Sequence, residues 1–177
     1  MTARNGPDGY GWVTKTMHWL TVLAVTAQFT VGYLMDAEES GHGRGRGRGR
    51  SGESGRGRGG GGEGSGYLDD PQTLLMVHVV LGLTILVLAV GRLAWRRVSG
   101  LPPWSEHLGP GQRRLAHWTE RALLTLLFVV PISGLLLVAV GDDDVLTLHI
   151  GAHIAFFVAL AAHLSTNLRP PVLRRML

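Results

Sequence analysis

The chain has 177 residues, of which 45% are hydrophobic and 17% are charged, and it contains no cysteine. The lack of cysteine excludes haem attached through a C-x-x-C-H motif, cysteine-ligated iron–sulfur clusters and disulfide bonds. Any metal chemistry must therefore use the eight histidines. The net charge of +4 invites a comparison with nucleic-acid-binding proteins. Basic residues beside long apolar segments more often set the orientation of a membrane protein, so we expect no nucleic-acid partner.

The first apolar run, residues 12–35, is long enough to cross a bilayer as a helix. The polar residues 1–11 before it lack the cleavage-site pattern of a secretory signal, so we expect the run to be retained. One face of this helix carries small or polar residues at spacings of three and four, which suits an inward face of a bundle. These residues are His18, Thr21, Val25, Gln28 and Gly32.

The stretch at residues 41–66 is rich in glycine and arginine. Glycine at this density cannot offset the entropy lost on ordering, so we expect a disordered loop between the first two helices. Binding of nucleic acid by the arginines is the alternative, but the stretch lacks interleaved aromatic residues.

The second predicted helix covers residues 71–97 and begins with Pro71, a residue favoured in the first turn. His78 and Arg92 share one of its faces and are 14 residues apart. Arg92 has two interpretations. It either extends along the helix to reach the membrane surface or forms an ion pair with a carboxylate of a bound cofactor.

Residues 98–111 are predicted to form a loop that leaves His107 in solvent, because they include three prolines and three glycines. The third predicted helix covers residues 112–140, and Pro131 should kink it. His117 near its start is interpreted as a polar neighbour of the site or a quinone-side residue, not as a ligand.

The last apolar run, residues 146–168, carries three histidines although it is long enough to span a membrane. An ionisable side chain at membrane depth is costly and marks a site with a partner. His149 and His163 are 14 residues apart, which places both on one helix face at a separation of roughly 21 Å. This helix should therefore supply one ligand to each of two stacked cofactors. His153 remains an alternative to His149.

The basic residues near the helix ends fall on one side of the membrane if four helices alternate in direction. All five tryptophans fall on the same side, as a belt at the interface would. We therefore predict a multi-pass membrane protein with both termini in the cytoplasm. The predicted fold is all-α: a four-transmembrane-helix bundle, up-down-up-down, forming a single membrane domain over residues 1–177.

Alternating helices place the histidines at two depths, with His78 and His149 on the outer side and His18 and His163 on the inner side. Two imidazoles on opposite sides of a plane are what a low-spin b-type haem requires, and occupation of both axial positions favours electron transfer. Arg92 would then lie at the inner level, where its guanidinium suits a haem propionate.

Several motifs resemble those of the bacterial cytochrome b561 family of di-haem membrane cytochromes. They are K-T-M-H-W around His18, V-H-V-V-L-G around His78 followed by G-R-L-A-W-R, L-A-H-W around His117 followed by P-I-S-G, and the pair His149 and His163. The resemblance implies two haems b bound by histidines matching His18, His78, His149 and His163, and exchange of electrons with membrane quinone. It also implies a location in the bacterial plasma (inner) membrane. One branch of the family is similar to a superoxide:quinone oxidoreductase.

The leading hypothesis is therefore a stand-alone electron-transfer oxidoreductase that couples quinone or quinol to an outer partner, either superoxide or a redox protein. The alternative is a haem b membrane-anchor subunit of a hydrogenase or dehydrogenase. A third hypothesis, from a different class, is a haem-free transporter of metal ions or protons that uses the histidines.

Overall fold

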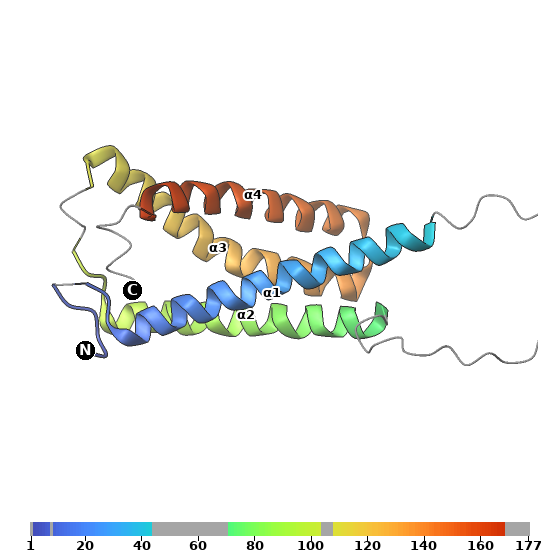
Figure 1. Ribbon diagram of the computed structural model, residues 1–177, viewed down its shortest axis with the longest axis horizontal. Coiled ribbons are helices and arrows are strands. Elements are labelled where there is room, and N and C mark those ends of the chain that lie inside the picture. The colour runs from blue at the N-terminus through green and yellow to red at the C-terminus, as the bar shows by residue number, and fades with distance from the viewer. Residues whose placement is uncertain (1, 8, 44–70, 104–107, 169–177) are drawn as a thin grey trace, which may run out of the picture.

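The computed structural model describes residues 2–7, 9–43, 71–103 and 108–168. It contains four α-helices: α1 (Trp12–Gly43), α2 (Pro71–Ser99), α3 (Pro110–Val140) and α4 (Asp143–Asn167). Consecutive helices run in opposite directions along the long axis of the molecule (Figure 1). The prediction of an all-helical chain is confirmed.

The helix ends follow local capping chemistry. Pro110 opens α3, where the missing N–H has no cost, and the Gln112 side chain accepts a hydrogen bond from the Gly109 amide at 3.2 Å. α3 ends at Gly141, which adopts a left-handed backbone with φ of 65° and donates its N–H to Leu137 O at 2.8 Å. The Asp142 carboxylate then caps α4 by accepting from two backbone amides of its first turn.

Five boundaries differ from the predicted ones. α1 continues past Met35 to Gly43, α2 continues past Arg97 to Ser99, α3 begins at Pro110, and α4 runs from Asp143 to Asn167. Helix termini accommodate polar and capping residues that carry no apolar pattern, so hydrophobicity alone misses the first or last turn. Of the predicted loop at 41–66, residues 41–43 lie in the last turn of α1, and the rest lies outside the described residues.

The helices pack as two antiparallel pairs, α1 with α2 and α3 with α4, and α2 also contacts α3. A small cluster of buried residues lies where the pairs meet: Ala24, Ile85, Ala89, Leu127 and Phe156. The outer surface carries many exposed large apolar side chains, such as Leu23, Val87 and Val158. Such an apolar surface is suited to contact with lipid and not with water.

Three helices in the described part of the chain are long and apolar enough to cross a membrane: Gln72–Ser99, Pro110–Val140 and Asp143–Asn167. α1 is not among them, because its apolar run is interrupted by Lys15, His18 and Gln28 as well as by several threonines.

The segment before α1 is fastened to the end of α2 by Asn5. The Asn5 backbone N–H donates to Ser99 Oγ at 2.9 Å, and its side-chain amide donates to Gly100 O at 2.7 Å. Asn5 Oδ1 accepts from the Gly11 amide at 3.0 Å and from the Thr14 hydroxyl at 2.8 Å. One side chain therefore joins the N-terminal segment, α1 and the end of α2.

Candidate functional site

Three polar residues from three helices gather near the end of the bundle where α1 begins, and we call His18, Arg92 and His163 the inner cluster. Nη1 of Arg92 lies 3.5 Å from Nδ1 of His18. His18 and His163 lie within electrostatic range of each other and of Arg92. The Arg92 guanidinium thus contacts the inner cluster.

Other charged groups surround Arg92. Glu120 on α3 and Tyr10 lie within electrostatic range of its guanidinium. Glu120 Oε1 is itself paired with Arg96 Nη1 at 2.9 Å. Because the carboxylate has this closer partner, the Arg92 guanidinium keeps donor capacity for another anion.

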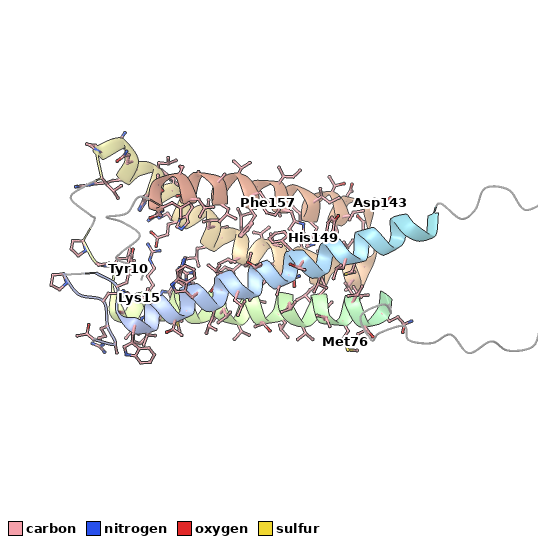
Figure 2. All side chains as sticks on the ribbon, viewed as in Figure 1. Tyr10, Lys15, Met76, Asp143, His149 and Phe157 are labelled. Carbon is pink, nitrogen blue, oxygen red and sulfur yellow. The ribbon has the colours of Figure 1, made fainter. Side chains whose placement is uncertain are left out.

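Three histidines form a second group in the other half of the bundle, and we call His78, His149 and His153 the outer cluster. The rings of His149 and His153 on α4 are 4.3 Å apart between centroids, and both lie within electrostatic range of His78 on α2. Figure 2 shows His149 in the half of the bundle remote from Lys15.

The contacts between α1 and α2 occur at two levels, with the same spacing as the two clusters. Gly32 on α1 faces the His78 ring, and His18 on α1 contacts Arg92. Gly32 and His18 are 14 residues apart, as are His78 and Arg92. Since α4 places His149 and His163 at the same spacing, three helices present groups at two levels separated by roughly 21 Å.

The outer cluster has room for a group that the protein does not itself supply. Among the described residues, Nδ1 of His78 is buried without a hydrogen-bond partner, as is Oε1 of Gln28 on α1. A Cβ at Gly32 would lie 3.4 Å from Cε1 of His78, so the glycine lets the ring lie directly against the α1 backbone. A buried imidazole without a protein partner fits a residue that binds a cofactor.

Two residues of α3 that the sequence reasoning did not assign to the site contact His149. Ser133 Oγ lies 2.9 Å from Nδ1 of His149, and Gly134 lies directly against the His149 ring. Both belong to the P-I-S-G motif at residues 131–134. This motif was the feature of the sequence that could have indicated Ser133 and Gly134 as site residues. It did not show which histidine they would contact.

The remaining histidines take other positions. His153 packs edge-on against Phe29 at 5.3 Å between centroids. His117 on α3 lies edge-on to the neighbouring Trp118 at 5.9 Å. His107 lies outside the described residues. Within the described ranges, no three or more histidine, aspartate or glutamate side chains are placed to hold a single metal ion.

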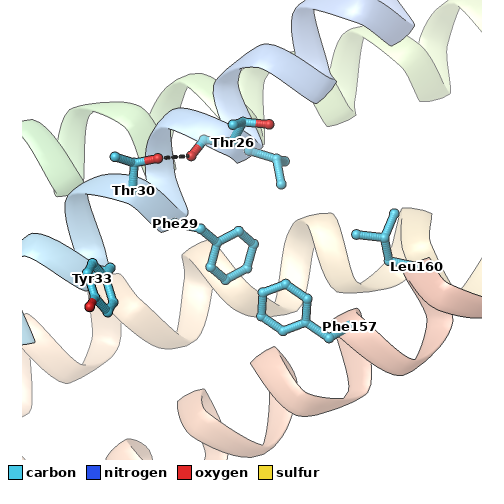
Figure 3. A pocket seen from close by; sticks show the side chains of 7 residues that line it. Thr26, Phe29, Thr30, Tyr33, Phe157 and Leu160 are labelled. Atoms are coloured by element: carbon cyan, nitrogen blue, oxygen red, sulfur yellow. Dashed lines mark hydrogen bonds between the residues drawn. The ribbon is translucent and has the colours of Figure 1, made fainter.

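An open groove of about 450 Å³ separates α1 from α4 between the two clusters. In Figure 3 the rings of Phe29 and Phe157 face each other across it, and their centroids are 4.6 Å apart. Thr26, Thr30 and Leu160 also line it. An aromatic side chain from each helix thus fills part of the space between the two levels of histidines.

Half-buried imidazoles from different helices, within a bundle of membrane-length apolar helices, are the arrangement of a membrane haem protein. The chain belongs to the prokaryotic cytochrome b561 family, whose family model matches residues 9–177. The resemblance seen in the sequence motifs is thereby confirmed. Comparison with curated proteins and with solved structures gave no match. Membership of this family makes the protein a prokaryotic membrane cytochrome that binds haem b and transfers electrons.

Proposed function

We propose that the protein carries electrons across the membrane through two haems b per chain. His18 and His163 would hold the inner haem, and His78 and His149 would hold the outer haem. The observation that carries this proposal is the division of the polar residues into two clusters, each with histidines from two helices. A single site would not need the same 14-residue step in α1, α2 and α4.

Each haem supplies a one-electron iron couple when bound. Two imidazoles per site would hold each haem, which would leave no position on the iron open for oxygen. The Arg92 guanidinium offers a planar set of donors to a propionate at the inner level. The apolar exterior of α2, α3 and α4 keeps the sites within the membrane.

In the proposed topology α1 is the fourth span, and both termini lie in the cytoplasm of a bacterial cell. Antiparallel packing of α1 against α2, from the Thr14–Trp95 contact to the Gly32–His78 contact, supports this, since α2 itself is long enough to cross the membrane. The polar residues of α1, including His18 and Gln28, then face the bundle and not the lipid. Reporter fusions at the N terminus and at residue 103 should both read cytoplasmic. An external signal from either would overturn the topology.

The proposed electron partners are membrane quinone or quinol and an outer donor or acceptor, for which superoxide is the small-molecule candidate. Purified protein in lipid should exchange electrons with a quinol analogue without any other subunit. A strict requirement for a soluble subunit would instead favour the role of a hydrogenase or dehydrogenase anchor.

Alanine variants of the histidines test the ligand set directly. The purified protein should be red with a bis-histidine b-type spectrum and two haems per chain. His18→Ala and His163→Ala should each lose the inner haem and keep the outer one, whereas His78→Ala and His149→Ala should do the reverse. His153→Ala should keep both. Loss of the outer haem in His153→Ala, and not in His149→Ala, would overturn the assignment at the outer site.

A further inference from the structure

Ser133 is a buried residue of α3, only 3% exposed, that contacts one of the proposed haem ligands. We propose that Ser133 is a positioning residue, which holds His149 in the tautomer whose Nε2 is free to bind iron, while Gly134 provides the space for the ring. The inference rests on the proposed function, because it takes His149 as the outer ligand.

The hydrogen bonds of Ser133 assign the tautomer. Its hydroxyl donates to Val130 O at 3.0 Å, which uses the single hydrogen that a serine side chain has. The 2.9 Å contact with His149 is a hydrogen bond alongside this one only when Ser133 Oγ accepts, so the tautomer that satisfies both contacts carries its proton on Nδ1 of His149. A neutral imidazole with its proton on Nδ1 has a lone pair on Nε2.

The inferred bond from Nδ1–H of His149 to Ser133 Oγ matches the chemistry of other metal-binding histidines. Histidines that bind metals usually donate their second ring N–H in this way, and the bond orients the ring.

Gly134 makes the close approach of the ring to α3 sterically possible. The nearest ring atom, Cε1, would lie 2.9 Å from a Cβ at this position. Any larger residue would push the imidazole away from the Ser133 hydroxyl. The pair Ser133 and Gly134 thus determines both the orientation and the depth of the His149 ring.

These contacts distinguish His149 from His153. In the described part of the chain, His153 packs its ring against Phe29 and His149 and makes no hydrogen bond. Its tautomer is therefore not determined by a partner, whereas that of His149 is. The structure thus favours His149 as the ligand by a criterion independent of its 14-residue distance from His163.

A hydrogen bond from a ligand's Nδ1–H makes the imidazole more basic, which stabilises the ferric haem relative to the ferrous haem. Removal of the acceptor should therefore raise the midpoint potential of the outer haem. We expect about a tenfold change in the one-electron equilibrium, which corresponds to about 59 mV. The haem should also dissociate about tenfold more readily.

The test is a potentiometric titration of the purified protein with both haems bound, together with the rate of haem transfer to a haem-free acceptor protein. Ser133→Ala should raise the outer potential and leave the inner potential unchanged. Ser133→Thr retains the hydroxyl and should restore the original potential. Thr119→Val is the matched control, because Thr119 is also buried on α3 and its hydroxyl also donates only to its own helix, to Leu115 O and Ala116 O.

An unchanged outer potential in Ser133→Ala, or an equal shift in Thr119→Val, would overturn the positioning role. If Ser133→Ala lacks the outer haem altogether, recovery in Ser133→Thr supports the role and continued loss overturns it. Retention of the outer haem by His149→Ala would instead overturn the proposed ligand set. Loss in His149→Ala combined with no effect in Ser133→Ala overturns only the role of Ser133.

Discussion

Replacement of Gly134 by alanine tests whether the His149 ring lies against α3 in the functional protein. The added Cβ would lie 2.9 Å from Cε1 of His149 and 3.6 Å from both ring nitrogens. Ordinary contact begins near 3.4 Å, so the ring or the helix must move by about 0.5 Å. The ring has little freedom to do so, because Ser133 and His153 contact it from two other sides.

The size of the effect follows from two opposing contributions to stability. Overpacking costs about 1–3 kcal/mol, and alanine recovers up to about 1 kcal/mol of helix propensity relative to glycine. The free energy of unfolding should thus fall by about 2 kcal/mol at most, and helix content should be unchanged. A displacement of about 0.5 Å is at the limit that a preorganised site tolerates, so affinity for the outer haem should fall about tenfold or more.

The assay is the ratio of haem to protein, combined with titration of haem into the haem-free protein. Gly134→Ala should bind the inner haem normally and the outer haem weakly. Gly151→Ala is the matched control, because it lies on α4 with no atom within 4 Å of an added Cβ. Two haems bound by Gly134→Ala with the original affinity would refute the packing of His149 against α3.

Two further predictions concern the end of the bundle where α1 begins. Arg92→Ala should keep both haems but lower the inner midpoint potential by about 59 mV, a tenfold change in the one-electron equilibrium, because a nearby positive charge favours the ferrous state. Potentiometry should show no shift in Arg97→Ala, whose side chain is exposed, and an equal shift there would contradict the argument. Asn5→Ala removes three side-chain hydrogen bonds and should lower local stability by about 1–3 kcal/mol. Amide exchange at Gly11 and in the first turn of α1 should then be faster while haem content stays the same. Unchanged exchange rates would show that hydrogen bonds to water replace these bonds without a loss of stability.

The sequence was sufficient to predict the four helices and to show which side chains share a face within each one. The apolar runs predicted four helices, and Pro71 marks the start of α2 as expected. The 14-residue step placed His149 with His163, and His78 with Arg92, because a regular helix repeats its faces at a known angle. The histidine motifs were distinctive enough to identify the family, which the family model confirms.

Relations between helices were the part that required the tertiary structure. The sequence left Arg92 with two interpretations, and only the tertiary structure shows that its guanidinium lies 3.5 Å from His18 on another helix. The P-I-S-G motif was visible, but nothing in its residues indicated that Ser133 and Gly134 would meet His149. The choice between His149 and His153 likewise depends on a neighbouring helix. Helical periodicity determines which side chains share a face, whereas the choice of opposing face depends on how whole surfaces pack together.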